Sequence, residues 1–228
     1  MSEPRVVLLA GATGLVGTRA MQAVASHPSI RLVALTRREA PIPRGVRMEM
    51  MVAEPAGWGE ALAAIRPDAL ICALGTTMRK AGSEEAFRAV DHDLVLSLAK
   101  AARELEVANF VLVSSVGADL LSRTFYLRVK GEVEAGVARL RFRRLDILRP
   151  GLLRGRRSGD RRALERLAIL ASPLTDLLLH GQRRRFRSID ARAVAAAALH
   201  FSGEKAPGKF VHDNDAIIRA ARRFEAAQ

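Results

Sequence analysis

The chain has 228 residues, of which 49% are hydrophobic and 27% are charged, and its formal net charge is +13 at pH 7. A chain of this length buries a substantial core and is most economically one domain, while a single cysteine, Cys72, argues against a disulfide framework or a thiolate metal site. Because the N-terminus lacks a basic segment before an apolar stretch, and no run reaches the roughly 18 apolar residues of a membrane span, we predict a soluble cytoplasmic protein.

The first predicted element is a buried strand over residues 5–10, which runs directly into the loop GATGLVG at residues 11–17. Its three glycines, between a strand and a helix, are typical of the phosphate-binding turn of a dinucleotide-binding fold. Gly11 permits the tight turn, Gly14 lets the backbone approach the pyrophosphate, and Gly17 lets the helix lie close to the sheet. The free N–H groups at the helix N-terminus then attract the anion.

The second predicted strand, residues 30–36, ends where the adenosine ribose is expected. NAD-selecting sites place a carboxylate there, about 20 residues after the glycines, where it accepts hydrogen bonds from the ribose 2′-OH. This strand runs instead into Arg37 and Arg38, whose guanidinium groups match a 2′-phosphate. We therefore expect NADP(H) to be favoured over NAD(H); the alternative is that one or both arginines form a solvated strand end.

Apolar runs and segments of helical spacing then alternate along the chain. Further strands are predicted over residues 46–52, 69–74, 109–114 and 145–149. Helices are predicted over Leu15–Ser26, Trp58–Ile65, Ser83–Glu106 and Ser122–Leu140. The alternation predicts an α/β fold with a Rossmann-type doubly wound parallel sheet flanked by helices. We expect residues 1–150 to form the dinucleotide-binding core of a single domain that spans residues 1–228.

The pattern changes after Pro150 to a basic loop, an amphipathic stretch from Arg161 to Leu179 and a helix that starts after Asp190. We expect residues 151–228 to form substrate or lid elements packed on the core. The apolar face of the stretch 161–179 favours packing over the sheet or a lid, and a partner interface is the alternative.

Candidate acid/base residues follow the predicted strand 109–114. Ser114 and Ser115 end this strand, and Tyr126 and Lys130 come next, four residues apart on one face of a predicted helix. A lysine ammonium beside a tyrosine favours the phenolate and so permits proton transfer, while a serine hydroxyl at the strand end orients the substrate oxygen. Tyr126 is also the only tyrosine in the chain. The alternative is a purely structural tyrosine and lysine.

Five segments together resemble the short-chain dehydrogenase/reductase superfamily, and most closely its atypical NAD(P)H-binding branch similar to the TIP30 oxidoreductase-like group. They are GATGLVG, ALGTT at residues 73–77, FVLVSSVGAD at 110–119, YLRVK with the following GEVE, and LRPGLL at 148–153. The resemblance is close over residues 5–155 and loose over the remainder.

This resemblance implies site residues by position. The pyrophosphate would be held by Gly11, Thr13, Gly14, Leu15, Val16 and Gly17, the 2′-phosphate by Arg37 and Arg38, and the nicotinamide-side ribose by Leu74, Gly75 and Thr76. Pro150, Gly151, Leu152 and Leu153 would pass beside the nicotinamide. Tyr126 would be the proton donor, and Lys130 would bind the ribose and tune Tyr126. Ser115 would orient the substrate, with Ser114 as the alternative.

One departure from the family pattern concerns Asp91, which stands where many extended relatives have an asparagine. It places in doubt a proton relay like that of the asparagine-containing members. Asp91, His92 and Asp93 are not expected to bind a metal, because adjacent helical residues point in different directions. His27 is expected to end the first helix. The remaining histidines, His180, His200 and His212, have no assigned role.

Nucleic-acid binding is suggested by the net charge and by the clusters Arg156-Arg157, Arg161-Arg162 and Arg183-Arg184-Arg185. However, only 4% of the residues are aromatic, and there is no stacking platform or known nucleic-acid module. We therefore expect no dedicated nucleic-acid binding.

The predicted function is that of an NADP(H)-dependent oxidoreductase acting on a small carbonyl or alcohol substrate of unknown identity. The alternative is an NADP(H)-sensing regulatory or scaffold protein without turnover. The sequence indicates no oligomeric state.

Overall fold

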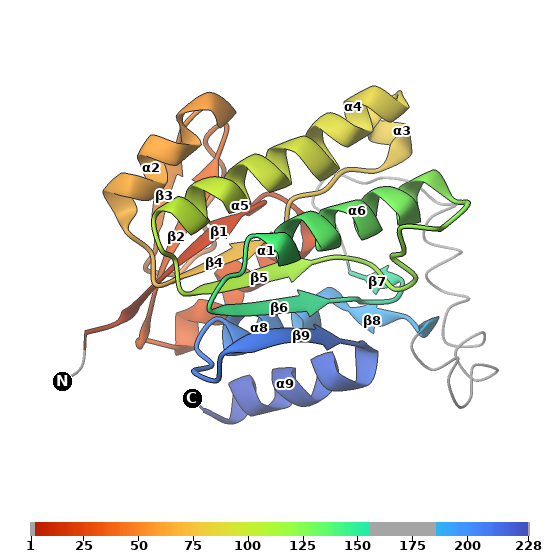
Figure 1. Cartoon of the computed structure of the whole chain (residues 1–228). Coiled ribbons are helices and arrows are strands. Elements are labelled where there is room, and N and C mark those ends of the chain that lie inside the picture. Colours follow the sequence, from red (N-terminus) through yellow and green to blue (C-terminus); the bar gives the residue numbers. More distant parts are fainter. Residues whose placement is uncertain (1–2, 156–185, 228) are drawn as a thin grey trace.

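A sheet of seven parallel strands, in the order β3-β2-β1-β4-β5-β6-β9, is the centre of the computed structural model, which describes residues 3–155 and 186–227 (Figure 1). The strands are β1 (Arg5–Ala10), β2 (Ile30–Thr36), β3 (Glu49–Val52), β4 (Ala69–Cys72), β5 (Asn109–Val113), β6 (Arg144–Leu148) and β9 (Gly208–His212). The pairing of β1 with both β2 and β4 creates the switch point at which open α/β sheets bind ligands. The predicted α/β doubly wound fold is confirmed.

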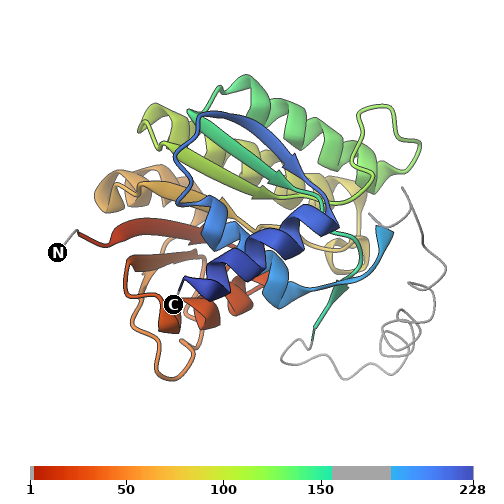
Figure 2. The same cartoon turned by 90° about the horizontal axis from the view of Figure 1, so that it is seen from below.

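Helices cover both faces of this sheet. On one side lie α2 (Trp58–Ile65), α5 (Leu94–Glu104) and α6 (Phe125–Arg139), and on the other lie α1 (Leu15–Ala23), α8 (Ala191–Phe201) and α9 (Asn214–Ala226). Figure 2 shows α8 and α9 crossing the second face. The alternation of side chains along a strand divides the core accordingly, because Val7 and Leu9 pack toward α1 and α8, whereas Leu8 and Ala10 pack toward α2 and α5.

Several shorter elements connect these layers. They are η1 (Val24–Ser26), η2 (Pro55–Gly57), α3 (Met78–Ala81), α4 (Glu84–Arg88) and the π-helical segment η3 (Ala89–Asp93). A separate parallel pair is formed by β7 (Leu153–Arg154) and β8 (Ile189–Asp190). Ser83, the first residue of the helix predicted over 83–106, caps α4 by accepting a hydrogen bond from the N–H of Ala86. The single helix predicted over 83–106 is instead three consecutive elements, α4, η3 and α5.

The C-terminal part of the chain contributes more to the sheet than the sequence indicates. The helix predicted after Asp190 is α8, and the Asp190 side chain caps it by accepting from the N–H of Arg192. Strand β9 and helix α9 are not predicted from the sequence. Because β9 is an edge strand with mostly exposed residues, it has no apolar run. Across residues 3–155 and 186–227, no helix combines the length and apolar character needed to cross a membrane.

Candidate functional site

A cavity of about 750 Å³ lies at the carboxyl ends of β1, β2 and β4. Its wall brings together three segments that the sequence singles out: the glycine turn, the Arg37-Arg38 pair and the loop after β4. The predicted residues on its wall are Gly11, Thr13, Gly14, Leu15, Arg37, Arg38, Leu74, Gly75 and Thr76. Val16 and Gly17 are buried in α1 and lie behind this wall.

The glycine turn has the shape that its sequence predicts. Gly11 has a φ of +88°, and a Cβ there would lie only 2.4 Å from the carbonyl oxygen of Ala73. A Cβ on Gly17 would lie 2.2 Å from the carbonyl oxygen of Gly11. A side chain at position 11 would collide with the backbone that follows β4, and one at position 17 would push α1 away from the turn, so glycine is required at both. Gly14 is the N-cap of α1, and the first N–H groups of this helix are available to an anion.

The charged part of the cavity wall is entirely cationic among the described residues. Arg37 and Arg38 are joined there by Arg19 of α1 and Lys80 of α3, with no acidic side chain. Both arginines that follow β2 are exposed, and within the described part of the chain neither makes a hydrogen bond or ion pair. Sequence reasoning misses Arg19, which lies one turn after Leu15 on α1, and Lys80, whose short helix was not predicted.

Tyr126 and Lys130 lie in the first turns of α6, with Nζ of Lys130 6.0 Å from the centroid of the tyrosine ring. Phe87 packs edge-on against this ring at a centroid distance of 5.7 Å. Lys130 is buried, and its Nζ lies 2.7 Å from Oδ1 of Asp91. Burial opposes the charge of Lys130, but the attraction of Asp91, aided by Tyr126, outweighs it, so the pKa of Lys130 lies above its ordinary value.

The lysine and the cavity meet at Gly75. A Cβ on Gly75 would lie 3.3 Å from Oδ1 of Asp91 and 3.7 Å from Nζ of Lys130, so the ion pair lies directly behind the cavity wall. Tyr126 and Ser115 do not themselves line the cavity. The structure therefore places Lys130, one member of the predicted acid/base pair, next to the predicted dinucleotide site, directly behind Gly75.

The two candidate serines differ in their contacts. Oγ of Ser114 is buried and donates a 2.5 Å hydrogen bond to Oε1 of Glu134 on α6. Ser115 is only partly buried, and its hydroxyl makes one long bond of 3.3 Å to the carbonyl oxygen of Val116. Of the two hydroxyls, that of Ser115 therefore has the weaker protein partner.

The segment from Pro150 to Leu153 lies outside the cavity wall. The carbonyl oxygen of Pro150 accepts from the N–H of Val116 at 2.9 Å, which joins the loops that follow β5 and β6. Gly151 is held by Oδ1 of Asn214, and a Cβ there would lie 2.1 Å from the carbonyl oxygen of Arg187. This segment is therefore a fixed junction between the main sheet and the pair β7-β8.

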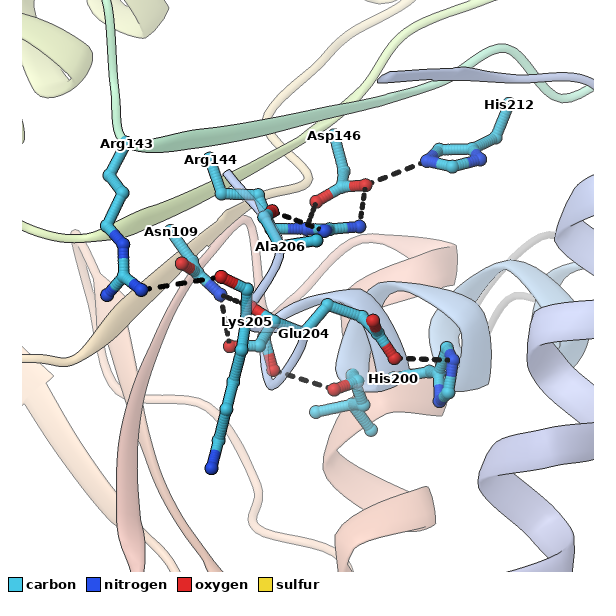
Figure 3. Close-up of polar contacts among 11 residues, drawn as sticks. Asn109, Arg143, Arg144, Asp146, His200, Glu204, Lys205, Ala206 and His212 are labelled. Carbon is cyan, nitrogen blue, oxygen red and sulfur yellow. Dashed lines mark hydrogen bonds and ion pairs between the residues drawn. The ribbon is translucent and has the colours of Figure 1, made fainter. Parts of the chain in front are cut away.

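A cluster of polar residues around β6, separate from the cavity, has a structural role (Figure 3). Asp146 is fully buried and accepts from Nε and Nη2 of Arg144 at 2.6 and 2.9 Å, while Nε2 of His212 lies 2.8 Å from its Oδ1. Arg144 also donates to the carbonyl oxygen of Ala206. These contacts join β6, β9 and the loop after α8, and they give His212 a structural role.

The described histidines among the remaining polar candidates each contact a protein group. His27 ends η1, as predicted, and its two ring nitrogens lie 3.1 and 3.0 Å from the carbonyl oxygens of Ala23 and Phe224. His92 pairs with Asp93, and His200 lies 3.3 Å from Glu204. His180, the stretch Arg161–Leu179 and the clusters at 156–157, 161–162 and 183–185 lie outside the described residues.

Comparison with known proteins gives a family match and a set of fungal relatives. The family model HIM1 matches residues 58–183. "Protein fmp52, mitochondrial" of Emericella nidulans is 38% identical over 164 residues, covering 69% of this chain and 70% of that protein. The protein of the same name from Aspergillus fumigatus is 34% identical over 212 residues, covering 89% of this chain and 91% of that protein.

Solved structures share the fold at low sequence identity. MoeE5 in complex with UDP-glucuronic acid and NAD has a TM-score of 0.69 at 17% identity, covering 90% of this chain and 74% of MoeE5. A putative NAD-dependent epimerase/dehydratase from Bacillus halodurans has a TM-score of 0.68 at 20% identity, covering 96% of this chain and 99% of the other. These likenesses confirm the Rossmann-type fold.

One expectation is contradicted by these relatives. The N-terminal residues and the lack of a long apolar run predict a cytoplasmic location, yet the fungal relatives are named as mitochondrial proteins. The cytoplasmic prediction is therefore wrong. Its physical basis was weak, because a membrane span and a secretory signal are only two of the features that decide where a protein resides.

Proposed function

The chain belongs to the HIM1 family, and we propose that it is an NADP(H)-dependent oxidoreductase of the short-chain dehydrogenase/reductase type. The observation that carries this proposal is the meeting of two sites at Gly75. This residue lines the cavity of the glycine turn, and the Lys130 ammonium, which belongs to the Tyr126–Lys130 pair, lies directly behind it.

The shape of the cavity supports a dinucleotide as the ligand. Gly11 and Gly17 allow a tight turn at the N-terminus of α1, and the cavity is large enough for an extended ligand. The neighbouring folds of MoeE5 and of the Bacillus halodurans protein are described as NAD-binding or NAD-dependent. The pyrophosphate is held by the backbone from Gly11 to Gly17.

The charge of the cavity supports NADP(H) over NAD(H). Arg37 and Arg38 stand at the end of β2, where an NAD site needs a carboxylate, and no acidic side chain lines the described wall. Guanidinium groups without protein partners are available for the 2′-phosphate. Arg19 and Lys80 add positive charge to the same wall and favour a ligand with three phosphate groups.

The acid/base residues support proton transfer to a carbonyl oxygen. The bound dinucleotide supplies the hydride. Tyr126 donates its phenolic proton to the carbonyl oxygen of the substrate and recovers a proton from water. The Lys130 ammonium stabilises the phenolate that forms, and the Ser115 hydroxyl holds the substrate oxygen by a hydrogen bond.

One observation favours the alternative of an NADP(H)-sensing protein without turnover. Tyr126 and Ser115 are absent from the cavity wall, so a dinucleotide can fill this cavity without touching either residue. The placement of the chain in the TIP30-like branch, the assignment of residues 151–228 to substrate elements and the passage of Pro150–Leu153 beside the nicotinamide remain predictions.

Titration of the purified protein with NADPH and NADH, followed by a panel of small aldehydes and ketones, tests the proposal. We expect saturable binding with NADPH preferred, and NADPH oxidation with at least one carbonyl class. Tight NADPH binding with no oxidation across the panel would support the sensor instead. Absence of binding to either dinucleotide would reject both functions.

A further inference from the structure

Asp91 is a fully buried carboxylate whose two oxygens have different partners. Oδ2 accepts a 2.7 Å hydrogen bond from the backbone N–H of Thr76, which lines the cavity. Oδ1 lies 2.7 Å from Nζ of Lys130 and, among the described residues, has no other donor. One side chain therefore touches both the cavity loop and the lysine that faces Tyr126.

The backbone around Asp91 has a form that gives the carboxylate this position. Residues Ala89–Asp93 are π-helical, and the N–H of Leu94 bonds to the carbonyl oxygen of Ala89, five residues earlier. A π-helical turn inserts one extra residue and rotates the following side chains relative to an α-helix. Val90 and Leu94 consequently line the cavity, while Asp91 points behind the wall.

The chemistry of the two partners requires a carboxylate. The Thr76 N–H and the Lys130 ammonium are both donors, and an ionised aspartate offers an acceptor to each. An asparagine of the same shape offers one acceptor and turns its NH₂ group toward the other donor. A buried ammonium also needs an opposite charge, because an unpaired buried charge is strongly unfavourable.

From this geometry we propose that Asp91 is a positioning residue, which holds Lys130 charged and in place behind Gly75 and ties it to the loop that receives the dinucleotide. The inference rests on the proposed function for its catalytic meaning. In place of the proton relay of the asparagine-containing relatives, this chain has a direct ion pair between Asp91 and Lys130. Among the described residues, the charged or titratable groups that face Lys130 are Asp91, Tyr126 and the Cys72 thiol.

The ionisation of Lys130 tests the proposal without a substrate or cofactor. The chain has only five lysines, Lys80, Lys100, Lys130, Lys205 and Lys209, so ¹³Cε-labelled lysine gives a simple NMR spectrum in which Lys130→Met identifies one signal. We expect the Lys130 signal to titrate above its ordinary range in the natural protein. In Asp91→Asn the midpoint should fall by at least about one pH unit. An unchanged midpoint overturns the proposal.

Asp93→Asn is the matched control. Asp93 lies on the same π-helical turn, but its side chain is 66% exposed and pairs with His92. This variant should leave the Lys130 titration as it is in the natural protein. An equal shift in both variants would mean that Lys130 responds to the general charge of the helix, and would overturn the specific role of Asp91.

Asp91→Asn leaves a buried lysine without a partner, and this variant can fail to fold for that reason. In that case Asp91→Asn/Lys130→Met, which removes both charges, should recover the folded state by circular dichroism. A double variant as unfolded as the single one overturns the proposal, since the loss would not depend on Lys130.

NADPH binding supplies the functional readout. In Asp91→Asn, the NADPH dissociation constant should rise about tenfold between pH 7 and a pH one unit above the Lys130 midpoint of that variant, as Lys130 loses its charge, and it should stay nearly constant over the same range in the natural protein and Asp93→Asn. If no variant binds NADPH, the proposed function fails while the NMR result still decides the ion pair. If NADPH binds normally and is insensitive to Asp91→Asn at both pH values, the positioning role alone is rejected.

Discussion

The Ser114 hydroxyl donates a hydrogen bond to the carboxylate of Glu134. Both oxygens of this carboxylate also accept from Nε of Arg149, at 3.0 and 3.1 Å. These contacts tie the ends of β5 and β6 to α6, the helix that carries Tyr126 and Lys130. Ser114 is thus committed to the scaffold, whereas Ser115, the next residue, has no strong partner.

The two serines should therefore respond differently to removal of their hydroxyl groups. Ser115→Ala should lower kcat/KM for carbonyl reduction by about a hundredfold, because the substrate oxygen loses a hydrogen-bond donor. Ser114→Ala should lower the free energy of unfolding by about 1 kcal/mol and leave turnover close to normal. Steady-state kinetics and urea unfolding measure the two effects, and a reversed pattern would assign the substrate role to Ser114.

Replacement of the tyrosine separates chemistry from binding. Tyr126→Phe keeps the ring that packs against Phe87 but removes the proton donor. We expect kcat to fall by at least about a hundredfold, while the NADPH dissociation constant changes little. Stopped-flow kinetics and NADPH titration provide the measurements. Turnover equal to that of the natural protein would exclude Tyr126 as the acid.

The arginine pair should determine cofactor preference. Arg37→Ala/Arg38→Ala should weaken NADPH binding by at least about tenfold, through loss of charged hydrogen bonds to the 2′-phosphate, and should weaken NADH binding much less. Arg31→Ala is the control, because Arg31 lies on β2, the strand that the arginine pair follows, but pairs with Glu49 at the surface. Calorimetric titrations compare the two dinucleotides, and equal losses for both would contradict the NADP(H) assignment.

His200 should make folding stability depend on mildly acidic pH. Burial lowers the pKa of His200 below its ordinary value of 6.5, with Glu204 partly opposing the shift. Because the unfolded chain then takes up the proton at a higher pH than the folded one, the stabilisation is full above pH 6.5 and is lost as the pH falls. The loss should be less than about 1 kcal/mol, since the side chain is only partly buried. Urea unfolding between pH 7.5 and 5 should show a smaller pH dependence in His200→Gln, and an identical dependence would contradict this role.

Cys72 should be inert in the folded protein. Burial raises the pKa of this thiol to about 11, and Cys72, the last residue of β4, is fully buried. At pH 8 we expect a chromogenic disulfide reagent to react at least about a hundredfold more slowly with the native protein than with the urea-unfolded chain. The reaction rate of this single cysteine then reports how often the whole protein unfolds. Equal rates in the two states would show that the end of β4 is open to solvent.

Features that depend on residues close together along the chain could be predicted from the sequence. The glycine turn follows from three glycines between an apolar run and a helix, and the bounds of α2, Trp58–Ile65, match the prediction because apolar spacing and local turn signals define that helix. The close placement of Tyr126 and Lys130 also follows from local geometry, since residues four apart on a helix share a face.

Contacts between residues from distant segments could not be predicted, because they depend on how the elements pack in three dimensions. The ion pair of Asp91 with Lys130, the Arg19 and Lys80 side chains at the cavity, and the contact of Asp146 with His212, 66 residues away, depend on how helices and strands pack. The spacing of apolar residues indicates which face of a helix or strand is buried, but it does not indicate which other element covers that face. For the same reason β9 could not be found from its five residues: its place in the sheet comes from pairing with β6 and not from an apolar pattern of its own.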